Sequence, residues 1–162
     1  MSDEPAPLFS HSESIRIAAP PLRVWELVTA MERYGEWSSE NTGGYWRKID
    51  GVAGTGAVGD QFVGVNRRGE QEWKGLVEIV ERDEGRSYAF VTGGVALNFV
   101  FWRYVLEAEG DHTLLTEQWA LRNLSPIMIE NGASEVAQRV ANAKESIGAT
   151  LAGLKRIAES AH

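Results

Sequence analysis

Cysteine is absent from this sequence of 162 residues, which excludes disulfides, thiolate metal ligands and thiol nucleophiles. Basic residues are too few for a nucleic-acid surface, since 16 Lys and Arg stand against 23 Asp and Glu, a net charge of −7. Long apolar runs are also missing. The best run, residues 95–101, contains Asn98 and is far shorter than the roughly 20 residues that a membrane-spanning helix needs. We therefore expect neither a nucleic-acid partner nor membrane insertion.

Histidine is scarce and scattered. His11 falls in a predicted N-terminal tail, His112 in a predicted turn, and His162 ends the chain. None lies near acidic residues at metal-ligand spacing, so we expect no metal site, and no histidine is available as the general base of a hydrolase. Residues 54–59 spell G-x-G-x-x-G, but a strand follows them where a dinucleotide site needs a helix, so we expect no cofactor.

The length fits one domain. We predict a flexible tail over residues 1–11 and a single domain over residues 12–162. The tail carries neither the basic nor the apolar segment of a secretion signal, so we expect a cytoplasmic protein.

The hydrophobic pattern predicts an α+β fold. A first strand at residues 12–18 precedes two short helices at 22–31 and 32–37, and a long helix covers about 134–160. Six further strands are predicted between them, at residues 45–50, 60–67, 71–81, 87–92, 97–108 and 113–122. The short breaks between these strands favour antiparallel hairpins. Since only the last helix is long enough to cover a seven-stranded sheet, we expect a curled antiparallel sheet around it.

Several short motifs resemble one family. They are residues 19–21 (APP), 24–27 (VWEL), 34–37 (YGEW), 56–62 (GAVGDQF), 66–69 (NRRG), 102–104 (WRY), 116–119 (TEQW) and 150–155 (TLAGLK). In order and spacing they resemble the START-like (SRPBCC) superfamily, in particular its polyketide cyclase/dehydrase and lipid-transport group. The resemblance implies a helix-grip fold and a hydrophobic cavity between the sheet and the long helix. It also implies a small apolar or lipid-like ligand, but no single activity.

Strand alternation selects the side chains that face such a cavity. The inward candidates are Trp73, Tyr88, Phe90, Asn98, Trp102, Tyr104, Glu117 and Trp119, to which the resemblance adds Phe62 and Asn66. On the long helix we expect a stripe of mostly small residues to oppose them, with Ala137, Ala141 and Lys144 as ligand contacts. Large residues packed against small ones predict either a filled core or an aromatic-lined pocket, and the resemblance favours the pocket.

Glu117 is the acidic residue among these inward candidates. Burial between Leu115 and Trp119 should raise its pKa, so Glu117 and Tyr104 are candidate groups for proton transfer. The alternatives are a buried ion pair with Lys144 or Arg47, or a different register that exposes the carboxylate.

Phe99 and Phe101 should face outward, which suggests a partner surface such as a homodimer; a register shift or cover by the tail is the alternative. The function that fits best is binding or transport of a small hydrophobic ligand. The alternative is a polyketide cyclase/dehydratase-type enzyme.

Overall fold

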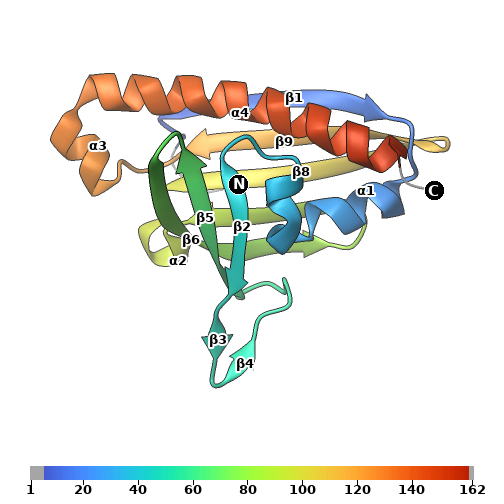
Figure 1. Cartoon of the computed structure of the whole chain (residues 1–162), viewed down its shortest axis with the longest axis horizontal. Coiled ribbons are helices and arrows are strands. Elements are labelled where there is room, and N and C mark those ends of the chain that lie inside the picture. Colours follow the sequence, from blue (N-terminus) through green and yellow to red (C-terminus); the bar gives the residue numbers. More distant parts are fainter. Residues whose placement is uncertain (1–5, 161–162) are drawn as a thin grey trace.

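The structure is a computed structural model that describes residues 6–160. One antiparallel sheet of seven strands, in the order β1-β9-β8-β7-β6-β5-β2, curls beneath the long helix α4 (Figure 1). The sheet strands are β1 (Phe9–Ile17), β2 (Asn41–Trp46), β5 (Gln61–Arg68), β6 (Gln71–Asp83), β7 (Ser87–Thr92), β8 (Val100–Glu109) and β9 (His112–Leu121). The helices are α1 (Pro21–Val28), the 3-10 helix η1 (Met31–Glu36), α2 (Gly94–Leu97), α3 (Pro126–Asn131) and α4 (Ala133–Ser160). The predicted α+β helix-grip architecture, with two short helices after the first strand, is confirmed.

The first strand differs from the prediction at its start. β1 begins at Phe9, so residues 9–11, which the sequence assigned to a tail, pair with the end of β9. The strand alternates from its beginning, and the pairing with β9 continues that alternation through His11 and Glu13. Residues 1–5 of the predicted tail lie outside the described residues.

Two regions differ from the strands predicted there. β3 (Lys48–Ile49) and β4 (Val52–Ala53) form a separate two-stranded hairpin that projects from the sheet beyond β2 (Figure 1). The helix α2 replaces the start of the strand that was expected at residue 97, and β8 begins only at Val100. Gly93 and Asn98 bound α2 in the left-handed conformation, with φ of 82° and 48°. Because a left-handed residue does not fit a strand, Asn98 cannot lie in β8.

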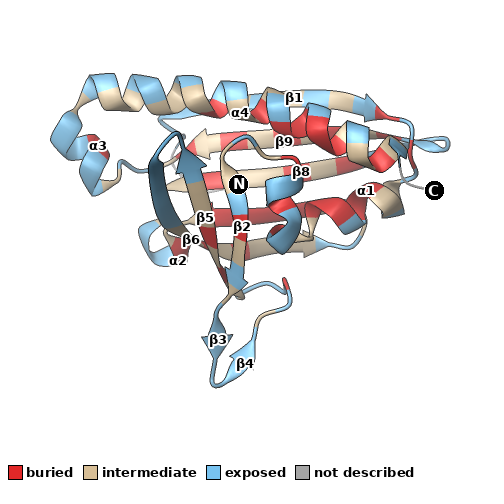
Figure 2. Cartoon of the chain, in the orientation of Figure 1, coloured by how far each residue is buried: buried red, intermediate tan, exposed pale blue. Residues whose placement is uncertain are grey.

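The hydrophobic core lies between the sheet and the helices α1, η1 and α4. Its inner layer comes from alternate strand residues, among them Ile17, Phe62, Ile79, Tyr88 and Leu115, all at most 1% exposed. Burial along α4 is uneven: its buried positions begin at Ala143, whereas residues 133–142 are exposed or half-buried (Figure 2). The closed half of the core therefore lies under the second half of α4.

A second, smaller cluster lies on the outer face of the sheet, where Phe101 packs with Ala89 and Val91. Phe101 is only 9% exposed, because the guanidinium groups of Arg103 and Arg122 lie 4.8 and 4.2 Å from its ring centre. The prediction that Phe99 and Phe101 are both exposed is therefore wrong for Phe101. Sequence alternation placed it outward, as observed, but gave no sign that two arginines cover it.

The C-terminal end of α4 is fastened to β1. Lys155 Nζ donates to the backbone oxygen of Arg16 at 2.9 Å, and the backbone N–H of Ala18 donates to Glu159 Oε2 at 2.7 Å. Lys155 and Glu159 also pair with each other, one turn apart on the helix. These bonds fix the helix along the edge strand of the sheet.

Candidate functional site on the inner face of the sheet

Four ionisable side chains form a row across the inner face. The strand register places Glu13 of β1 opposite Glu117 of β9, Glu117 opposite Tyr104 of β8, and Tyr104 opposite Tyr88 of β7. Directly opposed residues in antiparallel strands have Cβ atoms about 5 Å apart. The register therefore brings two carboxyl groups and two phenols into one line beneath α4.

Glu117 is the buried acid of this row, with 3% of its surface exposed. One carboxyl oxygen, Oε1, is buried without any hydrogen-bond partner. Burial raises the pKa of Glu117 to about 8, while a hydrogen bond from Tyr104 opposes this rise and the charge of Glu13 adds to it. Glu117 is therefore protonated over most of the neutral range.

Neither of the buried ion pairs considered for Glu117 is formed. Lys144 is exposed on α4, and Arg47 donates to the side chain of Gln61 at 2.7 Å. The expected rise in the pKa of Glu117 is therefore not offset by a cation.

Tyr104 is 3% exposed, and burial together with the neighbouring charge of Glu117 raises the pKa of its phenol well above the usual value. Tyr34 of η1 is similarly buried and its pKa is also raised, mainly by desolvation. The phenol of Tyr104 is thus a neutral hydrogen-bond donor at any physiological pH. The Glu117–Tyr104 pair presents donors and acceptors but no charge at neutral pH.

His11 and Glu13 were missed by the sequence reasoning, which left His11 in the tail. Both face inward from β1, and His11 Nε2 lies 2.8 Å from Glu13 Oε2. Their side chains are 26% and 40% exposed, so this pair lies between Glu117 and solvent along the sheet edge. The available signal was the alternation of His11, Glu13, Ile15 and Ile17, which extends the first strand backwards.

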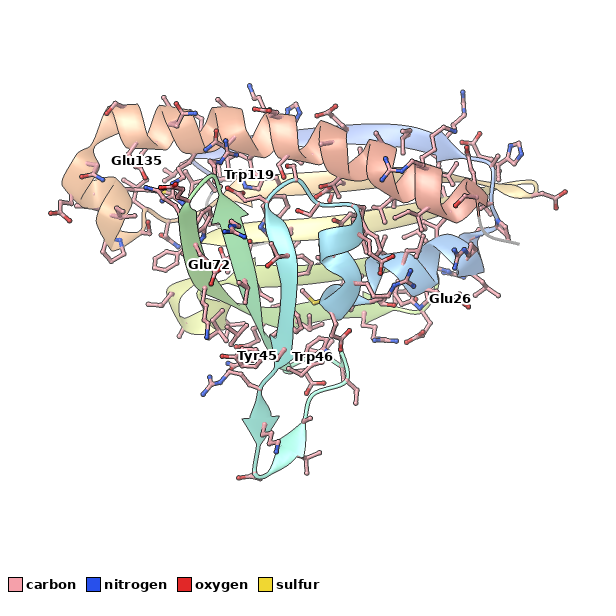
Figure 3. The ribbon with its side chains drawn as sticks, in the orientation of Figure 1. Glu26, Tyr45, Trp46, Glu72, Trp119 and Glu135 are labelled. Carbon is pink, nitrogen blue, oxygen red and sulfur yellow. The ribbon has the colours of Figure 1, made fainter. Side chains whose placement is uncertain are left out.

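An aromatic row runs parallel to the polar one. His11 lies opposite Trp119, Trp119 opposite Trp102, and Trp102 opposite Phe90. Trp119 is buried between β9 and α4 (Figure 3), whereas Trp102 remains only half-buried although it packs on the core.

Beyond Trp102, towards the tip of β6, the inner face is open. Trp73 is 36% exposed, and Asn66, opposite it on β5, is half-buried. Val136 and Val140 of α4 also stay partly exposed while packing on the core. The inner face therefore has a closed half, which holds Glu117, and an open half lined by apolar and amide groups. Phe62 belongs to the closed half, where it is 1% exposed and its ring centre lies 5.0 Å from that of Trp46.

Four of the predicted contacts do not face this site. Asn98 caps α2, and its Oδ1 accepts a hydrogen bond from Arg122 at 3.1 Å. Ala137, Ala141 and Lys144 are exposed on α4. The helix turns Val136, Val140, Ala143 and Ile147 towards the sheet instead. These positions precede the predicted stripe by one residue, which is about 100° around a helix of 3.6 residues per turn.

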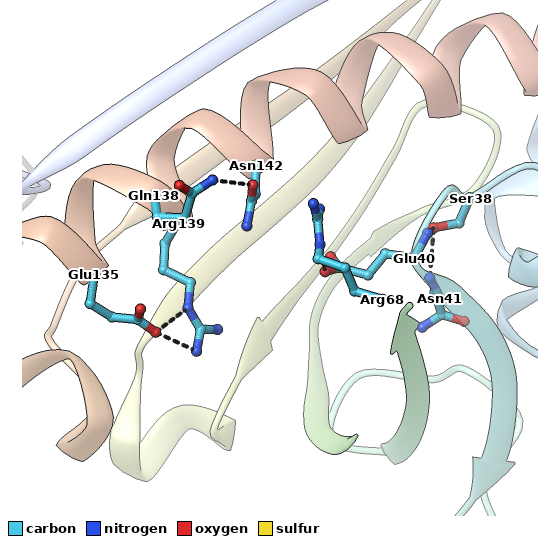
Figure 4. A network of polar contacts seen from close by, with 8 residues as sticks. All are labelled: Ser38, Glu40, Asn41, Arg68, Glu135, Gln138, Arg139 and Asn142. Carbon is cyan, nitrogen blue, oxygen red and sulfur yellow. Dashed lines mark hydrogen bonds and ion pairs between the residues drawn. The ribbon is translucent and has the colours of Figure 1, made fainter. Parts of the chain in front are cut away.

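Polar side chains border the open half (Figure 4). On α4, Glu135 pairs with Arg139 at 3.0 Å and Gln138 donates to Asn142 at 2.9 Å. On the opposite side of the opening, Arg68 pairs with Glu40 at 3.2 Å. A polar rim around an apolar interior is the usual arrangement of small-molecule sites.

Two hollows on the described surface lie elsewhere. One of about 300 Å³ lies between η1 and β2, around Glu32 and Thr42. Another of about 460 Å³ lies over β1, β8 and β9, around Ser12, Phe101 and Gln118. Neither is the interior cavity expected between the sheet and α4. Within residues 6–160 no group of three His, Asp or Glu side chains is arranged to hold a metal ion. No helix among those residues combines the length and the apolar character needed to span a membrane.

The sequence matches the model of one protein family. Residues 9–159 match the family described as polyketide cyclase / dehydrase and lipid transport. The chain belongs to this family. No curated protein matches the sequence.

Solved structures of the polyketide cyclase and START type share the fold. The Polyketide_cyc-like protein Cgl2372 from Corynebacterium glutamicum is 27% identical, with a TM-score of 0.64 over 91% of this chain and 90% of that one. A START superfamily protein from Mycobacterium smegmatis is 17% identical, with a TM-score of 0.65 over 91% of this chain and 97% of that one. The di-domain ARO/CYC BexL from the BE-7585A biosynthetic pathway is 18% identical, with a TM-score of 0.68 over 95% of this chain and 50% of that one. This polyketide cyclase / dehydrase family member thus spans half of the di-domain protein. The last two likenesses concern the fold alone.

Proposed function

We propose that this chain binds or transports a small, largely apolar molecule, held between the inner face of the sheet and α4 with Glu117 and Tyr104 as its polar anchor. The observation that carries the proposal is the unpartnered Oε1 of Glu117, buried in the core. Leaving a buried polar atom without a partner costs about 1–3 kcal/mol, which a ligand that supplies a partner recovers. The indole N–H of Trp37, 4% exposed, is a second unpartnered group in the same core.

The chemistry of the anchor favours a neutral ligand with a carbonyl or hydroxyl group. When Oε1 carries the proton of the Glu117 carboxyl it donates to a ligand carbonyl, and when the proton is on the other oxygen Oε1 accepts from a ligand hydroxyl. A ligand carboxylate would instead meet the charge of Glu13 across the strand pair. The partly exposed groups of the open half would touch the apolar part of the ligand, and its polar group would reach Glu117 and Tyr104 in the closed half, where the other buried side chains support them. The proposed site comprises Phe62, Asn66, Trp73, Tyr88, Phe90, Trp102, Tyr104, Glu117 and Trp119.

Binding of N-phenyl-1-naphthylamine, a neutral fluorophore with one N–H group, tests this proposal. We expect saturable binding that Trp102→Ala weakens, and that Glu117→Gln weakens by about 5- to 30-fold, equivalent to about 1–2 kcal/mol. Glu107→Gln is the matched control, since Glu107 is exposed on the same sheet. Equal affinities of the wild type and the Trp102 and Glu117 variants would remove the inner face from the proposal.

The alternative is a polyketide cyclase/dehydratase-type enzyme in which Glu117 and Tyr104 transfer protons beside a carbonyl. One observation favours it: a pKa of about 8 is close to the value at which a carboxyl works best as a general acid or base at neutral pH. The test is exchange of the α-protons of 2-tetralone, a neutral ketone on a ring fused to benzene, with deuterium oxide, followed by NMR. The enzyme hypothesis predicts exchange above the buffer rate that Glu117→Gln abolishes and Glu107→Gln preserves. Exchange at the buffer rate alone would favour the binding protein.

A further inference from the structure

The burial of Glu117 raises the question of how its carboxyl gains and loses protons. With 3% of its surface exposed and Oε1 buried without a hydrogen-bond partner, Glu117 has no direct exchange with water in this conformation. Tyr104 is its hydrogen-bond partner, but the pKa of that phenol is raised so far that it does not give up its proton at neutral pH. A proton must therefore reach Glu117 through another group.

Glu13 is in position to be that group. It lies directly opposite Glu117 in the strand pair, and its own side chain is 40% exposed. On the α4 side it faces Gly148, where even an added Cβ atom would lie 3.8 Å from Glu13 Oε1. The helix backbone therefore passes over Glu13 without a side chain of its own at that point.

His11 completes the connection to solvent. Its Nε2 lies 2.8 Å from Glu13 Oε2, and its side chain is 26% exposed. The imidazole ring carries two nitrogen atoms, so it can take up a proton from water on one side and pass a proton to a carboxylate on the other.

The other elements packed around Glu117 offer no competing acid or base. β8, η1 and β7 contribute the phenols Tyr104, Tyr34 and Tyr88, whose pKa values are all raised. The charged residues of α4 nearest to this level, Lys144 and Glu145, are exposed. The outward neighbours on β9 are the uncharged Thr116 and Gln118.

We propose that His11 and Glu13 form the route by which protons reach and leave Glu117, and that they are thereby positioning residues for the ligand site proposed above. In the inward direction, the imidazolium Nε2–H of His11 passes its proton to Glu13 Oε2. The Glu13 carboxylic acid then rotates and passes a proton to the Glu117 carboxylate. Glu13 is left ionised, and water reprotonates the His11 ring. The outward direction reverses these steps, with no net change in bonds apart from the position of one proton.

Carbon-13 NMR of the glutamate carboxyls tests the route without any ligand. The Glu117 signal, assigned by its loss in Glu117→Gln, is followed through its titration, and the exchange rate between its two protonation states is measured at the midpoint. Glu13→Gln removes both the relay group and a like charge. We expect it to slow exchange by at least about tenfold and to lower the midpoint. His11→Gln should slow exchange and leave a titrating Glu117.

Conservative and distant variants complete the experiment. Glu13→Asp retains a carboxyl and should restore much of the exchange rate, which a purely structural role of Glu13 would not predict. Glu109→Gln and His112→Gln, both at exposed positions of the β8–β9 hairpin, are the controls and should match the wild type. An unchanged exchange rate in Glu13→Gln overturns the route. Binding of N-phenyl-1-naphthylamine is measured on the same samples. If the fluorophore does not bind but proton exchange at Glu117 still depends on Glu13, the proposed function is wrong and the proton route is supported.

Discussion

The buried carboxyl of Glu117 makes the stability of the protein depend on pH in a direction opposite to that of an ion-paired acid. Its pKa rises from an ordinary 4.5 to about 8 on folding, mainly through desolvation. Below pH 4.5 the group is protonated in both the folded and the unfolded chain, so its ionisation contributes nothing to the free energy of unfolding. Between pH 4.5 and 8 only the folded chain holds the proton, so the free energy of unfolding falls as pH rises.

The loss in the free energy of unfolding can be calculated from the rise in the pKa of Glu117. At 1.36 kcal/mol per pH unit, the full rise corresponds to about 5 kcal/mol above pH 8 and about 3 kcal/mol at pH 7. Glu117→Gln keeps a similar shape and never ionises. We therefore expect the variant to match the wild type near pH 4 and to exceed it by up to about 5 kcal/mol at pH 9.

Urea unfolding between pH 4 and 9, followed by tryptophan fluorescence, measures this difference. Other titrating groups are common to both proteins, so they cancel when the two free energies are subtracted. Asp60, for example, has a lowered pKa because it accepts hydrogen bonds from three backbone N–H groups, and it destabilises both proteins equally in acid. Glu107→Gln should follow the wild type throughout. If the difference between Glu117→Gln and the wild type did not grow with pH, the inward, desolvated position of Glu117 would be wrong.

Two packing predictions concern the elements around the site. Gly153→Ala should destabilise by about 1–3 kcal/mol, because its Cβ would lie 2.8 Å from Trp37 Cβ. Gly148→Ala should instead stabilise the helix slightly, because its Cβ would lie 3.8 Å from Glu13 Oε1, an ordinary van der Waals contact; thermal unfolding compares the two variants. Phe101→Ala should cost about 3 kcal/mol in urea unfolding and leave the gel-filtration volume unchanged, while Phe9→Ala, 47% exposed, should cost far less. A large change in the gel-filtration volume of Phe101→Ala would instead indicate that Phe101 lies in an interface between two copies of the chain.

The sequence was most informative where one face of an element is continuously buried. Alternation in β8 and β9 placed Trp102, Tyr104, Glu117 and Trp119 on the inner face, because a one-residue slip there would expose the core. The long helix was harder to interpret. In its first half the apolar stripe begins with only Val136 and Val140, and a parallel stripe of alanines one residue away has the same spacing.

The features that the sequence analysis did not predict depend on contacts between residues that are distant in sequence. His11 joins the site only because β1 pairs with β9, more than a hundred positions later, and two nearby prolines suggested a tail. The cover of Phe101 by Arg103 and Arg122 is likewise a tertiary effect. Asn98 was assigned to a strand because nothing local in its apolar surroundings marked the short helix that it ends.

The bonds from Lys155 and Glu159 to β1 have a consequence for encounters between molecules. An edge strand offers a row of free backbone groups to which a strand from another copy can add. Here the carbonyl of Arg16 and the N–H of Ala18 are already taken by side chains of the same molecule's last helical turns. A second chain that added a strand at this end of β1 would first have to displace the last turns of α4, the helix that also closes the core. The same helix therefore covers the core and blocks strand addition at this end of β1.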